Sequence, residues 1–168
     1  MKTIINDINP EEQYLRIVER YKGIITKVCF YYSEDAEEFK DLRQDILAGI
    51  WSARDSFRSE ASLSTWIYRI SLNTCISALR KRKQRGERIP LDSITEPIQE
   101  TEELKEAYQD IHTLINSLRN EDKAIILLWL DEVSYEEISE IMGLPRNTVA
   151  TKLRRIKQQL ATMVRAEI

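Results

Sequence analysis

Residues 134–157, SYEEISEIMGLPRNTVATKLRRIK, carry the pattern that decides the fold of this chain of 168 residues. Ser134 and Glu137 have the spacing of a capping box, in which each side chain satisfies a free backbone N–H at the start of a helix. Gly143 then supplies the helix stop. A second helix opens near Asn147 with a buried apolar stripe and a basic outer face. The segment therefore predicts a helix-turn-helix, the arrangement that places its second helix in a DNA major groove.

The outward positions of the second helix are small, polar or cationic. Arginine can make bidentate contacts to guanine, and Thr or Ala can approach a thymine methyl group. The alternative is a charged surface helix in an ordinary bundle, but the turn and the cap lie in register with the basic face and favour DNA reading. The positions expected to face duplex DNA are Arg146, Asn147, Thr148, Ala150, Thr151, Arg154 and Arg155.

Composition favours helices throughout the chain. There are only four Gly and four Pro, against 42% hydrophobic and 32% charged residues, which argues against a turn-rich all-β protein. Gly86, Pro90 and Pro97 fall together in a polar, acidic stretch. We therefore predict an all-α fold of two small helical domains, residues 1–85 and 104–168, joined by a flexible acidic linker at 86–103.

The N-terminal domain has helical apolar stripes and one polar loop. A third helix begins after Ser62 or Ser64, either of which can serve as N-cap. Its first turns offer Trp66, Tyr68, Arg69 and Asn73 beside the loop at 56–64. Aromatic faces, cations and an amide are what an unstacked single-stranded base requires. The alternative is that Trp66 belongs to the core and Tyr68 is incidental, and the residues themselves leave both interpretations open.

Charge is distributed unevenly along a chain of net charge −3. Six basic residues lie between Arg80 and Arg88, and six more between Arg146 and Arg165. Each run could be a merely solvated face, but two such runs on a weakly acidic protein suggest two polyanion contacts and a further partner surface.

Nothing in the sequence points to a metal, a cofactor or a membrane. Cys29, Cys75 and His112 are isolated and cannot assemble a convincing zinc site. There is no signal peptide and no apolar stretch near the roughly 20 residues that a membrane span needs. We expect a reduced cytoplasmic protein with no membrane contact of its own.

Three segments in order resemble regions 2 and 4 of extracytoplasmic-function sigma factors, the small alternative sigma factors of bacterial RNA polymerase in the sigma-70 superfamily. They are DLRQDIL at 41–47, FRSEASLSTWIYRISLN at 57–73 and the helix-turn-helix at 135–155. The resemblance covers nearly the whole chain. It implies a factor that binds core polymerase, reads promoter DNA as duplex and as melted single strand, and does no chemistry.

The resemblance also implies a role for individual residues. It assigns core polymerase binding to Asp41, Leu42, Gln44, Asp45 and Leu47. It places a flipped base of the minus-ten element in a pocket of Ala53, Phe57, Arg69, Ile70 and Asn73. We add Trp66 because its aromatic face suits an unstacked base. It implies that the basic run binds nearby phosphates, and we assign this contact to Arg80, Lys81 and Lys83. It assigns the minus-thirty-five element to the outward positions of the second helix named above.

The helix-turn-helix of this chain departs from the family at two positions. Members of the family often have Gly at the position of Asn147 and a basic residue at that of Ala150, so a different minus-thirty-five sequence is expected. By resemblance the acidic linker should thread toward the polymerase active-site channel, and an anti-sigma protein should hold the factor inactive.

Two rival functions can be separated from this expectation. A stand-alone helix-turn-helix regulator would bind a palindrome as a dimer, but it leaves 41–47 and the loop at 56–64 without a purpose. A small nuclease would need metal-binding carboxylates in a basic cleft. Glu37, Glu38, Asp41 and Asp45 are acidic at helical spacing, yet they more easily form a solvated docking face.

Overall fold

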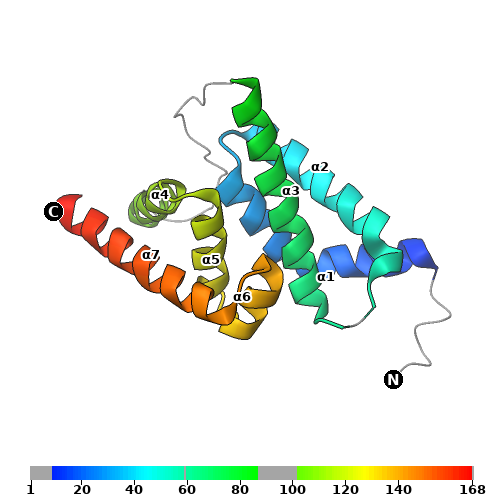
Figure 1. The fold of residues 1–168 in the computed structure, drawn as a ribbon. Helices are drawn as coiled ribbons and strands as arrows, with labels where there is room; N and C mark the ends of the chain where they lie inside the picture. Colours follow the sequence, from blue (N-terminus) through cyan, green and yellow to red (C-terminus); the bar gives the residue numbers. More distant parts are fainter. Residues whose placement is uncertain (1–8, 59, 87–101, 168) are drawn as a thin grey trace.

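The computed structural model describes residues 9–58, 60–86 and 102–167, and at 102–108 and 167 it describes the backbone alone. The described part is helical throughout (Figure 1), which confirms the predicted all-α fold. Its elements are α1 (Pro10–Tyr32), α2 (Ala36–Ala53), the 3-10 turn η1 (Arg54–Ser56), α3 (Leu63–Arg85), α4 (Glu102–Asn116), α5 (Asn120–Leu130), α6 (Tyr135–Met142) and α7 (Arg146–Glu167).

The helix ends follow from side-chain chemistry. Ser62 caps α3, because its hydroxyl accepts a hydrogen bond from the Thr65 amide at 3.1 Å, and this resolves the choice between Ser62 and Ser64. Gly86 ends the same helix with φ of 68°, in the left-handed region that glycine enters at little cost. At the other end of the chain, Ser134 and Glu137 form the predicted capping box.

Helices α1, α2 and α3 form a bundle whose core is made by one apolar stripe from each helix. Ile25 and Val28 of α1, Ile46 of α2 and Ile67 and Leu72 of α3 are at most 2% exposed. The spacing of three and four residues in the sequence is what brings these side chains to one face of each helix. Two free cysteines, Cys29 and Cys75, are fully buried in the same core.

The C-terminal helices pack around a second group of apolar side chains. Leu128 of α5, Ile138 of α6, and Val149, Leu153 and Ile156 of α7 are at most 1% exposed. Gly143 stands between α6 and α7 with φ of 64° and turns the chain sharply. The predicted helix-turn-helix is therefore formed by α6 and α7, and its second helix begins at Arg146, one residue before the expected start.

The two helical units also pack against each other, which periodicity in the sequence did not predict. Helix α3 contacts α5 and α6, and α1 contacts α4 (Figure 1). Tyr32 donates its hydroxyl proton to the Asn120 carbonyl at 2.7 Å, and Lys123 donates to the Tyr31 carbonyl at 3.1 Å. Most of the expected linker, at 87–101, lies outside the described residues.

Candidate nucleic-acid interface

The exposed face of α7 is the first candidate for contact with nucleic acid. Arg146, Asn147, Thr151, Arg154 and Arg155 are exposed. Thr148 and Ala150 are partly buried. The face therefore presents cations, an amide and small side chains, which suits a helix that lies in a major groove.

Several of these side chains are held by the neighbouring helices. The Arg146 guanidinium donates to Glu136 of α6 at 2.5 Å, and this hydrogen bond lowers the pKa of the Glu136 carboxyl. The same guanidinium lies 5.5 Å from the centre of the Tyr135 ring. Arg155 donates to Asp122 of α5 at 2.8 Å. The exposed face of α7 is thus partly ordered by contacts within the protein.

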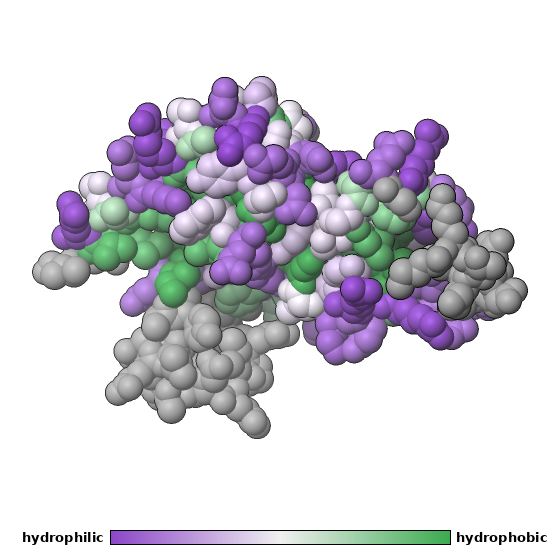
Figure 2. Space-filling model, turned by 90° about the horizontal axis from the view of Figure 1, so that it is seen from below, coloured by the Kyte–Doolittle hydropathy of each residue, from purple (hydrophilic) through white to green (hydrophobic). Residues whose placement is uncertain are grey.

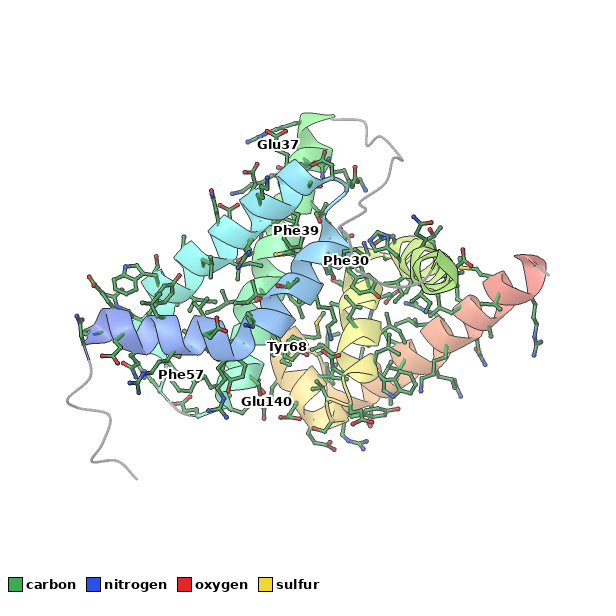
Figure 3. All side chains as sticks on the ribbon, turned by 180° about the vertical axis from the view of Figure 1, so that it is seen from behind. Phe30, Glu37, Phe39, Phe57, Tyr68 and Glu140 are labelled. Atoms are coloured by element: carbon green, nitrogen blue, oxygen red, sulfur yellow. The ribbon has the colours of Figure 1, made fainter. Side chains whose placement is uncertain are left out.

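The second candidate surface is the start of α3 together with the end of α2. The rings of Phe57 and Trp66 lie 5.3 Å apart at 52°. Both are partly buried, as are Ala53 and Ile70, whereas Asn73 is exposed. Trp66 therefore packs on the core with part of its ring and leaves the rest accessible. Figure 3 shows Glu37 and Phe57 at opposite ends of α2, so this surface is well separated from the acidic start of that helix.

Helix α2 approaches α3 closely behind this surface. A Cβ atom added at Gly49 would lie 3.3 Å from Cγ2 of Ile70 and 3.9 Å from the Thr74 hydroxyl. The absence of a side chain at position 49 thus lets Ile70 pack directly over the backbone of α2.

Arg69 is the one predicted minus-ten side chain that the described structure ties to the other domain. Its guanidinium donates to the Glu140 carbonyl of α6 at 3.0 Å. The neighbouring residue, Tyr68, donates its hydroxyl proton to Asp131, which also pairs with Lys27 of α1. Figure 3 shows Tyr68 and Glu140 in the region where α3 meets α6. Burial raises the pKa of Tyr68 to about 12, so the phenol keeps its proton at neutral pH.

The basic end of α3 divides into two groups. Arg80, Lys81 and Lys83 are exposed, so they are available for contact with phosphates. Arg82 turns the other way, because it pairs with Glu38 and lies 3.5 Å from Glu34. The expectation named the three exposed cations, and the structure keeps all three on the surface.

The acidic face of α2 forms an open groove with α3. It has a volume of about 320 Å³ and is lined by Asp35, Glu37, Glu38, Asp41, Leu42, Asp45, Ala78 and Arg82. Asp41, Gln44 and Asp45 are exposed and Leu47 is partly buried. Leu42 differs from the expectation, since it is 2% exposed and packs in the core. Because an apolar side chain gains free energy by leaving water, Leu42 holds α2 in the bundle and is not a free contact residue.

The described residues give no sign of a metal centre or a membrane span. No three His, Cys, Asp or Glu side chains among them lie close enough to hold a metal ion. None of the helices in the described ranges combines the length and the apolar character needed to cross a bilayer. Figure 2 shows a face covered largely by hydrophilic side chains, with apolar ones visible in separate small areas.

Asp122 and Asp131 were not predicted as functional residues. Asp122 fixes Arg155, and Asp131 joins the two domains. Both lie in α5 or directly after it, where the sequence reads as an acidic, solvated segment. Only the docking of other helices around α5 shows what these two carboxylates contact, so no spacing rule could have identified them.

Comparison with known proteins agrees with this geometry. Residues 17–85 match the family model of sigma-70 region 2, and residues 108–160 match that of sigma-70 region 4. A relative in Bacillus subtilis, the ECF RNA polymerase sigma factor SigW, is 27% identical and aligns with 92% of this chain and 90% of its own length. The ECF RNA polymerase sigma-E factor of Escherichia coli K12 is 28% identical, over 88% of this chain and 84% of its own.

Solved structures share the fold. The sigma factor RpoE of Bartonella quintana, in complex with the anti-sigma factor NepR, superposes with a TM-score of 0.72 over 94% of this chain and 98% of that one, at 22% identity. CnrH, in complex with the cytosolic domain of CnrY, gives a TM-score of 0.68 at 16% identity, over 92% and 89% of the two chains.

The order of the matches explains both halves of the molecule at once. Most of α1 and all of α2 and α3 fall within the region 2 match, and α5, α6 and most of α7 fall within the region 4 match. A stand-alone helix-turn-helix regulator would account for the second half alone. The chain belongs to the sigma-70 family and, within it, to the extracytoplasmic-function sigma factors, alternative sigma factors that act in transcription initiation.

Proposed function

We propose that this sigma factor divides promoter recognition between residues 1–85 and 104–168, with core polymerase bound through the acidic face of α2. In this division Asp41, Gln44 and Asp45 face the polymerase, and the start of α3 receives a flipped base of the minus-ten element. The face of α7 reads the minus-thirty-five duplex.

The observation that carries the proposal is the spatial separation of three different exposed surfaces. The acidic groove lies between the start of α2 and the end of α3. The exposed amide of Asn73 lies farther back along α3, on the half of that helix that carries Trp66 and Ile70. The cationic face of α7 belongs to the other domain. Each surface has the chemistry of its expected partner: carboxylates for a basic protein surface, an amide with aromatic rings for an unstacked base, and arginines for duplex DNA.

Within the minus-ten surface, the roles follow from side-chain type. Asn73 can both donate and accept, and so can pair with a base edge. Phe57, Trp66 and Ile70 provide apolar walls on which a base can stack. Arg80, Lys81 and Lys83, two to three turns farther along α3, are in position to contact phosphates without reading sequence.

Two further parts of the proposal rest on the family. RpoE, which shares this fold, is bound to the anti-sigma factor NepR in its solved structure, and we expect this chain to have a partner of that kind. We also expect it to work in the cytoplasm with core polymerase and to catalyse no reaction of its own.

The test is reconstitution with core RNA polymerase, followed by transcript mapping and by mobility shifts on the promoter that the mapping identifies. The isolated chain should bind that promoter weakly and the reconstituted holoenzyme tightly, because polymerase fixes the two DNA-reading surfaces at the spacing of the promoter elements. Tight binding of a palindrome by the isolated chain as a dimer would overturn the proposal.

A further inference from the structure

Asp122 is the one acidic side chain that lies in the core of the part of the chain that the structure describes, with 3% of its surface exposed. It belongs to the first turn of α5, where the partial positive charge of the helix end favours a carboxylate. That position does not require burial, because an exposed carboxylate would interact with the helix end equally well. The reason for burying it must lie in what Asp122 contacts.

Its contacts come from the helix that faces DNA in the proposed function. Oδ2 of Asp122 accepts a hydrogen bond from Arg155 at 2.8 Å. Nζ of Lys152 lies 3.6 Å from Oδ1, and 3.5 Å from the exposed Glu121. Arg155 and Lys152 are three residues apart and therefore share one face of α7. Two cations of the helix converge on a single buried carboxylate.

The arrangement fixes one end of Arg155 and leaves the other end free. A guanidinium has five N–H donors in a rigid plane, and one of them is used by Asp122. The Arg155 side chain remains 55% exposed, so other donors can reach a ligand outside the protein. A buried carboxylate is itself held by packing, and the direction of the guanidinium is therefore set before DNA arrives.

We propose that Asp122 is a positioning residue for promoter reading: it orients Arg155 toward the minus-thirty-five duplex. This inference rests on the proposed assignment of Arg155 to that element. Asp122 itself touches no DNA.

Two effects of Asp122 on binding have opposite signs, and this makes the inference testable. Its negative charge beneath α7 weakens the general attraction of the helix for phosphates. Its hydrogen bond restricts Arg155 to one orientation, which strengthens the sequence-specific contact. Loss of the charge should therefore raise affinity for any DNA while lowering the preference for the correct sequence. A residue that merely stabilised the fold would change both affinities in the same direction.

The experiment measures the affinity of the reconstituted holoenzyme for its mapped promoter and for the same promoter with a scrambled minus-thirty-five element, at several salt concentrations. Asp122→Asn keeps the shape of the side chain and removes its charge. We expect the preference for the correct element to fall about threefold to tenfold, less than for Arg155→Ala. The dependence of affinity on salt should become steeper. Glu121→Gln is the matched control, and it should leave the preference unchanged.

The outcomes separate this inference from the proposed function. If Arg155→Ala has no effect on the preference, the assignment of Arg155 to the minus-thirty-five element is wrong. If Arg155→Ala lowers the preference and Asp122→Asn does not, Asp122 is not a positioning residue. Should Asp122→Asn fail to fold, as judged by circular dichroism, Asp122→Glu keeps the carboxylate but shifts it by one methylene group. That variant should show an intermediate preference, and a wild-type preference would reject the inference.

Discussion

The contact between the two domains should weaken measurably when Asp131 is replaced by Asn. Asp131 receives both the Tyr68 hydroxyl and the Lys27 ammonium, which come from the opposite domain. Asn can still accept a hydrogen bond from Tyr68 but carries no charge to pair with Lys27. The variant therefore removes the ionic part of the contact and keeps the shape of the side chain.

The size of the effect follows from the burial of the pair. The Lys27 and Asp131 side chains are 28% and 29% exposed. Fully exposed ion pairs contribute about 0.2–1 kcal/mol to stability, and hydrogen bonds to charged groups contribute about 1.5–3 kcal/mol. A half-buried pair should lie between these two ranges. We expect a loss of about 1–2 kcal/mol. That loss shifts the equilibrium between docked and separated domains by roughly 5-fold to 30-fold.

The assay is energy transfer between dyes placed on cysteines introduced at Ser77 of α3 and Thr162 of α7, both exposed. Asp131→Asn should lower the transfer efficiency in the isolated chain. It should also raise affinity for a single-stranded minus-ten oligonucleotide, because separation of the domains frees Arg69 from the Glu140 carbonyl. Glu136→Gln, an exposed acid within the C-terminal domain, is the control. Unchanged transfer together with unchanged oligonucleotide affinity would refute the reasoning.

Three further predictions concern single surfaces. Asn73→Ala should slow promoter opening, because a lost base contact costs about 1–3 kcal/mol, while binding to core polymerase stays intact. Permanganate footprinting of the melted strand measures the opening, and a normal rate would reject the proposed pocket. Asp41→Lys with Asp45→Lys should abolish association with core polymerase in a pull-down while the circular dichroism spectrum stays normal, because exposed charges contribute little to stability; full association would remove this face from the interface. Burial lowers the pKa of Lys123 to about 8 in the folded protein, whereas in the unfolded chain the pKa is about 10.5. Between pH 8 and 9 the unfolded state therefore binds more protons than the folded state. The free energy of unfolding should rise with pH over this range. Urea denaturation at the two pH values checks this, and Lys123→Met should flatten the rise.

The sequence predicted those features that depend on neighbours along the chain. The apolar stripes, the caps at Ser62 and Ser134, and the turn at Gly143 are all set within a few residues, and the structure has each of them. The exposed cations of α7 were predictable for the same reason. Once the buried stripe of a helix is known, the remaining positions must face outward.

Features that depend on contacts between distant helices could not be read in the same way. Asp41 and Leu42 are adjacent in one motif, yet the first is exposed and the second lies in the core. The resemblance assigns both to polymerase binding, although the spacing of Leu42, Ile46 and Ile50 places Leu42 on the buried side of α2. No spacing links Tyr68 to Asp131, which lies 63 positions away. Partners of this kind are set by the docking of preformed helices.

The close approach of Gly49 to Ile70 constrains how this protein can change over evolution. The gap of 3.3 Å leaves too little room for a methyl group at position 49 unless Ile70 gives way by a few tenths of an ångström. The volumes at the two positions should therefore be coupled: a larger residue at 49 becomes tolerable when a residue without a γ-methyl group, such as Ala, stands at 70. Because Ile70 belongs to the proposed minus-ten pocket, such a paired exchange inside the bundle would also alter the wall that a promoter base meets. Promoter preference would then change through position 49, which is not among the proposed DNA contacts.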